Sequence, residues 1–159
     1  MKEDQNTDAW FTTMVDLYAL PEDFPGHATC KQFTDPLKKV RCLEDGLSGK
    51  ISHRRFIPYI QLHEFEALLF SEPAKFDVAF PDSKDAVQQL QKIRDESPSP
   101  EHIDDRPEFA PSKRILKLLP DYRKPVAGPT IAASIGLATL RRECPHFNQW
   151  ICKIEALAL

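Results

Sequence analysis

The residues RFIPYIQL, at positions 55–62, are followed without a break by HEFEALLF, at positions 63–70. The first stretch is rich in β-branched and aromatic residues and predicts a strand, whose proline places it at a strand start or at a sheet edge. The second stretch changes to a helical composition and ends before Pro73. The composition changes from strand-like to helical at His63. This predicted strand decides the fold class, because most of the remaining sequence pattern is helical.

A second strand is predicted towards the N-terminus, where WFTTMVDLY occupies positions 10–18. A helix is predicted between the two strands, with Asp35 as its N-cap, Pro36 as its first residue and Gly49 as its end. Strands separated by a helix are usually parallel. Because two strands alone make a poor sheet, we expect a partner chain or earlier strands of a larger domain to complete it.

The C-terminal part of the chain is predicted to be helical. We therefore expect an α/β fold with a short, mainly parallel sheet, several flanking helices and a helical C-terminal half, in a single domain over residues 1–159 that is incomplete at its N-terminus. The predicted helices cover residues 83–93, 111–119, 128–140 and 145–157, with an acidic loop over 101–108.

Composition excludes several classes of protein. The 159 residues carry 28% charged and 42% hydrophobic side chains, as a folded domain does, and a net charge of −3 excludes a globally basic surface. A membrane span and a secretory signal are not expected, so the predicted compartment is the cytoplasm. The four cysteines form no paired motif, and no secretory signal is expected. We therefore predict that Cys30, Cys42, Cys144 and Cys152 are all free, reduced thiols.

An acidic residue follows each predicted strand. Asp16 ends the first, and Glu64 and Glu66 come directly after the second. Because the carboxyl ends of parallel strands meet at one edge of a sheet, the three carboxylates are candidate ligands for Mg²⁺ or Mn²⁺, to which His63 could add a further ligand or a proton carrier. The alternative is that Asp16 caps the turn that follows it and that the glutamates stabilise a helix start.

Basic residues occupy a helix start in the segment APSKR, at positions 110–114. Lys113 and Arg114 lie beside the free backbone N–H groups of the helix start, and this combination suits a phosphate, so both are candidate phosphate-binding residues. Cations are normally preferred at the other end of a helix, so their position here requires an explanation. The alternative is that they pair with acidic residues of the loop before them, Asp104, Asp105 and Glu108. The turn from Cys144 to His146 favours a structural role, with His146 as a minor site candidate.

Four blocks of the sequence resemble the bacterial family called domain of unknown function 4276. Together they span most of the chain from Trp10 to Leu157. The blocks are FTTMVDLYALP with DFPG (11–26), FIPYIQLHEFEALLF (56–70), APSKRI (110–115), and IGL with RRECPHFNQW (135–150).

This family resembles the topoisomerase–primase (Toprim) fold, in the branch found in overcoming-lysogenisation-defect nucleases. The resemblance implies a Mg²⁺- or Mn²⁺-dependent nuclease of phage defence that acts on DNA or RNA with an ATPase partner. It implies that Asp16 is the leading residue of an Asp-x-Asp metal motif whose second position here is Tyr18. It further implies Glu64 and Glu66 as the acidic block and Lys113 as a phosphate contact.

Two features support an alternative function. Tyr18 stands where the motif has its second aspartate, and the family's first strand with its glutamate is expected to precede the present chain. With fewer ligands, the chain would be a catalytically inactive interaction subunit of a defence complex, and its open sheet edge could pair with a second copy.

Overall fold

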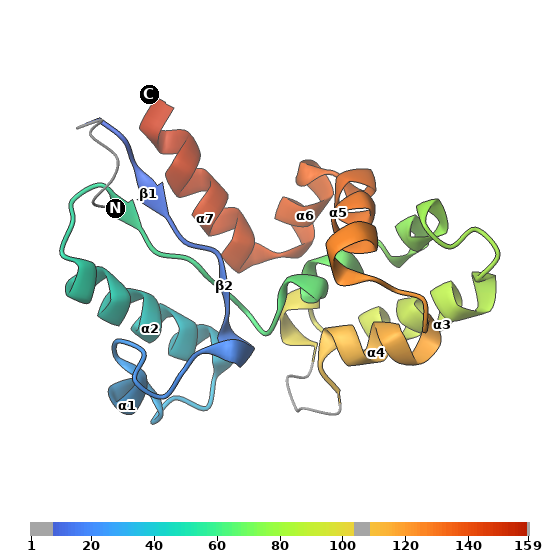
Figure 1. Ribbon diagram of the computed structural model, residues 1–159, viewed down its shortest axis with the longest axis horizontal. Coiled ribbons are helices and arrows are strands. Elements are labelled where there is room, and N and C mark those ends of the chain that lie inside the picture. Colours follow the sequence, from blue (N-terminus) through green and yellow to red (C-terminus); the bar gives the residue numbers. More distant parts are fainter. Residues whose placement is uncertain (1–7, 104–108, 159) are drawn as a thin grey trace.

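The computed structural model describes residues 8–103 and 109–158 (Figure 1). Two parallel strand pairs follow one another along the same two chain segments. They are β1 (Phe11–Thr12) with β3 (Phe56–Ile57), and β2 (Val15–Asp16) with β4 (Ile60–Gln61). The chain is a small α/β fold, and the predicted parallel direction is confirmed.

Each predicted strand is interrupted in the middle. The hydroxyl of Thr13 accepts a hydrogen bond from the backbone N–H of Tyr59 at 3.1 Å and donates one to the carbonyl of Tyr59 at 3.2 Å. A side chain therefore takes the place of backbone ladder bonds at this point, next to Pro58, which has no N–H to donate. The prediction of unbroken strands over 10–18 and 55–62 is wrong for this reason.

Helices surround this ladder. In Figure 1, α2 lies on one side of the strand segments and α7 on the other, while α3 to α6 form the second half of the molecule. The indole of Trp150 on α7 donates a hydrogen bond to the hydroxyl of Thr12 on β1 at 2.8 Å, which ties that helix to the ladder. The α-helices are α1 (His27–Cys30), α2 (Pro36–Ile51), α3 (Lys84–Asp95), α4 (Pro111–Leu118), α5 (Lys124–Ile135), α6 (Leu137–Glu143) and α7 (Pro145–Glu155). The 3-10 helices are η1 (Leu17–Ala19), η2 (Phe65–Ser71), η3 (Pro73–Val78), η4 (Pro100–His102) and η5 (Ala156–Ala158).

The start of α2 is confirmed and its predicted end is wrong. One carboxylate oxygen of Asp35 accepts hydrogen bonds from the N–H groups of Leu37 and Lys38, at 2.8 and 3.1 Å. The helix passes through Gly49 and ends at Ile51, and its C-cap Ser52, with a φ of 49°, supplies the left-handed residue that commonly closes a helix.

The long C-terminal helix predicted over 128–140 is two helices. The first, α5, begins four residues earlier, at Lys124, with Pro125 in its first turn. It ends at Gly136, whose φ of 79° favours glycine, and α6 starts at the next residue. The predicted helix over 63–70 is the 3-10 helix η2.

Buried apolar side chains form two clusters. The larger cluster joins η2, η3 and helices α3 to α7, and the smaller one lies between the β2–β4 pair and α1 and α2. The first strand segment is less well covered, since Trp10, Met14 and Tyr18 are all exposed. Apolar side chains are therefore exposed to solvent along this segment.

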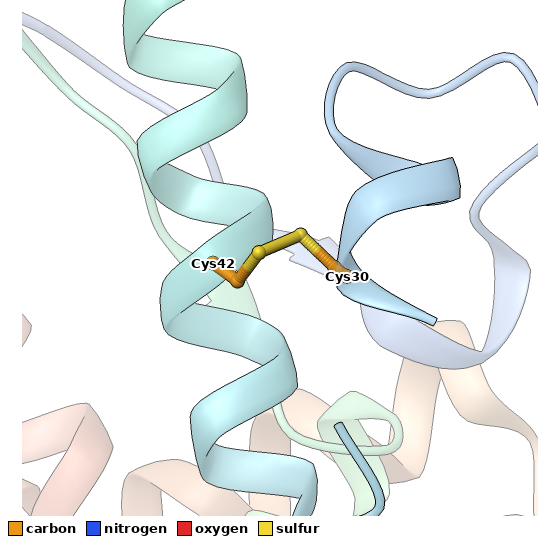
Figure 2. The surroundings of a disulfide bond; sticks show 2 residues. All are labelled: Cys30 and Cys42. Atoms are coloured by element: carbon orange, nitrogen blue, oxygen red, sulfur yellow. A yellow bond between two sulfur atoms is a disulfide. The ribbon is translucent and has the colours of Figure 1, made fainter. Parts of the chain in front are cut away.

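A disulfide joins Cys30 of α1 to Cys42 of α2 (Figure 2). The two Cα atoms are 5.8 Å apart, within the usual range for a bridge. Cys144 and Cys152 are free thiols. The prediction that all four cysteines are free is therefore wrong. It relied on sequence spacing, and the bridge forms between two packed helices.

Thiol titration should distinguish three states of the protein. Burial raises the pKa of Cys144 to about 12, so the native protein should expose one reactive thiol, that of Cys152. Two should react in denaturant and four after reduction in denaturant, since the chain has four cysteines and one bridge. Four reactive thiols in denaturant without reductant would contradict the disulfide.

Candidate functional site

The candidate site lies at the carboxyl edge of the β2–β4 pair. Asp16 ends β2 and pairs in register with Gln61 of β4, and Glu64 follows three residues later. The chain turns there at His63, a buried residue whose φ of 64° is left-handed and uncommon outside glycine. This turn directs the chain from β4 into η2, which carries Glu66.

The carboxylate of Glu64 is buried and bonded on both oxygens. Its Oε1 accepts hydrogen bonds from the hydroxyl of Ser112 at 2.9 Å and from the backbone N–H of Ser112 at 3.3 Å. Its Oε2 lies 2.8 Å from the ammonium of Lys124. Burial opposes ionisation, but the bonds from Lys124 and Ser112 outweigh it and hold the pKa of Glu64 below its usual range.

The carboxylate of Glu66 shares the same ammonium group. Lys124 Nζ lies 3.3 Å from Glu66 Oε2, and the phenol of Tyr122 donates to Glu66 Oε1 at 3.3 Å. Here burial prevails over the attraction of Lys124, so the pKa of Glu66 is raised. Glu64 and Glu66 are about 95% buried or more, whereas the side chain of Lys124 is 48% exposed. The cation is therefore the partner that faces solvent.

The charges of Glu64 and Lys124 also act on Asp16, but its hydrogen-bond partner is different. Its Oδ1 accepts a hydrogen bond from the backbone N–H of Phe65 at 3.0 Å. Burial raises the pKa of Asp16, and the charge of Glu64 adds to that effect. Asp16 makes no capping bond to η1, the turn that follows it, and contacts the first residue of η2 instead.

Asp16, Glu64 and Glu66 all carry carboxylates, and carboxylate oxygens are the ligands that hard divalent cations prefer. In the part of the chain that the structure describes, however, no three histidine, cysteine, aspartate or glutamate side chains are grouped to hold a metal ion. The position between Glu64 and Glu66 holds the ammonium of Lys124.

Lys113 and Arg114 lie apart from this cluster, on the far side of Ser112 along α4. Both line a groove between α3 and α4. The Nε of Arg114 donates to the carbonyl of Phe109 at 2.7 Å, and its guanidinium lies 5.2 Å from the centre of the Phe109 ring. The acidic residues considered as their alternative partners, Asp104 and Asp105 with Glu108, lie outside the described residues.

A family model matches almost the whole chain. The model described as "Domain of unknown function (DUF4276)" matches residues 1–155. The chain belongs to this family. No curated protein and no solved structure matches it. None of the helices within residues 8–103 and 109–158 is long and apolar enough to span a membrane.

His146 and Cys144 of this DUF4276 chain have structural surroundings. The imidazole of His146 is buried, with Nε2 lying 3.2 Å from Glu44 Oε1 and 3.1 Å from the carbonyl of Ile60, and it stacks on Tyr59 at 5.1 Å between ring centres. The thiol of Cys144 is buried beside the hydroxyl of Ser71 at 3.3 Å. The expected structural role of this turn agrees with these contacts.

The sequence patterns did not indicate Lys124, Tyr122 or Ser112 as partners of the carboxylates. A usable signal was present for Lys124, which is the first residue of α5, where the helix dipole disfavours a cation. The backbone N–H of Ser112, one of those expected to be free for a phosphate, and its hydroxyl both donate to Glu64.

Proposed function

We propose that the chain is a Toprim-like, metal-dependent nuclease domain of bacterial phage defence that acts on nucleic-acid phosphodiesters with an ATPase partner. The observation that supports the proposal is that Asp16 and Glu64 lie at the carboxyl edge of paired parallel strands, where open α/β folds bind their ligands, and that Glu64 shares the ammonium of Lys124 with Glu66. The family resemblance adds the reaction class and the partner.

In this proposal each residue of the edge has a role of its own. Glu64 and Glu66 hold the cation position that Lys124 now fills, and Ser112 fixes the orientation of Glu64 through two hydrogen bonds. Asp16 supplies a third negative charge. A bound Mg²⁺ or Mn²⁺ supplies charge neutralisation at the phosphate and an activated water. Lys124, once displaced, remains nearby as a half-exposed cation for the phosphate.

A catalytically inactive interaction subunit is the second candidate. Two observations favour it. Tyr18, at the second position of the aspartate motif, is 56% exposed, and the ammonium of Lys124 pairs with both Glu64 and Glu66. The exposed residues Trp10 and Met14 beside Tyr18 would then form a contact surface for another chain, including a second copy.

Plasmid cleavage distinguishes the two candidates. With Mg²⁺ or Mn²⁺ and the ATPase partner we expect nicking that EDTA abolishes and that Asp16→Asn lowers at least about 100-fold, since a metal site contributes several kcal/mol to such a reaction. Lys113→Ala should weaken cleavage by reducing phosphate contact. Asp77→Asn, at an exposed aspartate of η3, is the matched control and should cleave normally.

Two outcomes would contradict the nuclease proposal. Robust cleavage that survives both EDTA and Asp16→Asn would exclude a metal site at this edge. Stable association with the ATPase, without cleavage under any metal condition, would establish the interaction subunit instead.

A further inference from the structure

A cavity of about 240 Å³ lies between α2 and α7. Pro58 and Tyr59, which separate β3 from β4, form part of its lining. Glu44 of α2 and His146 of α7 also line it, and the side chains of both are buried. Pockets for drug-sized ligands usually exceed about 300 Å³, so this cavity fits a smaller molecule.

Glu44 differs from the other buried glutamates in having an oxygen without a partner. The buried glutamates of the described residues are Glu44, Glu64, Glu66 and Glu101. In each of the other three, both carboxylate oxygens have a hydrogen-bond or ion-pair partner. In Glu44, Oε1 accepts a hydrogen bond from the N–H of Ile60 at 2.9 Å, whereas Oε2 has no partner in the described part of the chain. A buried acceptor without a donor costs free energy, and a ligand N–H group would recover it.

No lysine or arginine of the described residues forms an ion pair with Glu44. Its charged neighbour is the imidazole of His146, whose Nε2 lies 3.2 Å from Glu44 Oε1 and 3.1 Å from the carbonyl of Ile60. The Nδ1 of His146 is enclosed without a hydrogen-bond partner, so a proton at that atom would have no acceptor. A neutral imidazole with its proton on Nε2 fits these contacts. An ammonium group at Glu44 Oε2 would therefore supply the positive charge that the buried carboxylate lacks.

Exposed charged residues complete the lining and favour an acidic group at the other end of the ligand. They are two cations, Arg41 and Lys153, and one carboxylate, Asp45. The guanidinium of Arg41 donates a hydrogen bond from α2 to the side-chain oxygen of Gln149 on α7, at 3.1 Å. Arg41 and Lys153 would repel a ligand that is only cationic, whereas a ligand that carries both charges places each against a group of opposite sign.

We propose that the α2–α7 cavity binds a small zwitterionic ligand of the amino-acid type. Its ammonium group bonds Glu44 Oε2, and its carboxylate group lies towards Arg41 and Lys153. Because the ligand contacts both helices, its binding should stabilise the native protein. The cavity shares no lining residue with the carboxylate edge, so this binding does not depend on the proposed nuclease function.

The test is a thermal-shift series in EDTA with the standard amino acids, each added singly at about 10 mM. We expect at least one amino acid to raise the melting temperature by about 3 °C or more at ten times its dissociation constant. Calorimetric titration then measures the affinity of that amino acid and of two derivatives. The N-acetyl derivative has lost the ammonium group and should bind at least about tenfold more weakly. The methyl ester keeps the ammonium group and has lost the carboxylate.

Two variants test the two ends of the ligand. Glu44→Gln keeps an acceptor for the N–H of Ile60 but removes the negative charge, and should weaken amino-acid binding at least about tenfold. Lys153→Gln, at an exposed position, should weaken binding of the amino acid about threefold without weakening binding of the methyl ester. The matched controls are Glu96→Gln and Lys31→Gln, at exposed positions outside the cavity, and both should bind like the wild type.

Three results would overturn the proposal. They are the absence of binding of any amino acid to the folded wild type, equal affinity for the N-acetyl derivative, and unchanged affinity in Glu44→Gln. If Glu44→Gln does not fold, the exposed variant decides. An unchanged affinity of Lys153→Gln for the amino acid, or an equal loss for the amino acid and its methyl ester, would contradict the placement of the ligand carboxylate.

Discussion

Replacing Lys124 by methionine should lower the free energy of unfolding by about 3 kcal/mol at neutral pH in EDTA. The methionine keeps the packing of the stem but leaves Glu64 and Glu66, both buried, without their shared cation. Breaking a buried pair on one side costs about 3–5 kcal/mol, and the half-exposed lysine places the effect at the lower end. Chemical denaturation of both proteins measures the difference.

The stability that Lys124→Met loses should depend on pH. In the wild type the pKa of Glu64 is held below its usual value of 4.5, so its contribution is present above that pH and is lost as the pH falls. In Lys124→Met, burial without the cation raises the pKa of both glutamates above their unfolded values, so stability falls as the pH rises through them. The difference between the two proteins should therefore grow from acid to neutral pH.

An exposed ion pair supplies the matched control. Lys75 lies 3.7 Å from Glu72, and both side chains are more than a third exposed. Lys75→Met should therefore change the free energy of unfolding by less than about 1 kcal/mol at every pH. An equally small effect of Lys124→Met would show that the two buried glutamates do not depend on that cation.

Replacing Glu101 by alanine should destabilise the fold by about 3 kcal/mol. Glu101 is 2% exposed and caps a helix that lies 45 residues away in sequence, since its two oxygens accept the backbone N–H groups of His146 and Phe147, both at 2.9 Å. These are the first turn of α7, where a carboxylate also interacts favourably with the helix dipole. The alanine variant leaves both N–H groups buried without acceptors.

Two further variants isolate this effect. Glu101→Gln keeps one good acceptor and should lose about half as much stability. Glu96→Ala removes an exposed glutamate at the end of α3 and should be nearly neutral. Equal stability of Glu101→Ala and Glu96→Ala in the same denaturation assay would contradict the capping role.

Local patterns predicted much of the fold. The Asp35 cap with Pro36, the start of α4 at Pro111 and the start of α7 at Pro145 are each encoded within one helical turn. Contacts between distant segments could not be predicted in this way. The disulfide between two helices, the Thr13–Tyr59 bonds that interrupt the strands and the cap supplied by Glu101 all depend on tertiary packing.

For the candidate site too, local sequence patterns predicted the positions of the residues but not their distant partners. Strand direction and an acidic residue after each strand were enough to place Asp16 and Glu64 at one edge. The partners that control their charge come from α4 and from the start of α5, far along the chain. The contacts that Lys124, Ser112 and Tyr122 make with the two glutamates therefore became visible only in the folded structure.

Calorimetric titration with Mn²⁺ tests the central claim, that the position between Glu64 and Glu66 is a divalent-cation site which Lys124 fills. Lys124→Met should bind Mn²⁺ more tightly than the wild type, because the cation no longer competes with an ammonium group, and binding should restore part of the lost stability. Adding Glu64→Gln to Lys124→Met should abolish that binding. Absence of Mn²⁺ binding to Lys124→Met, in a protein that is still folded, would contradict the account.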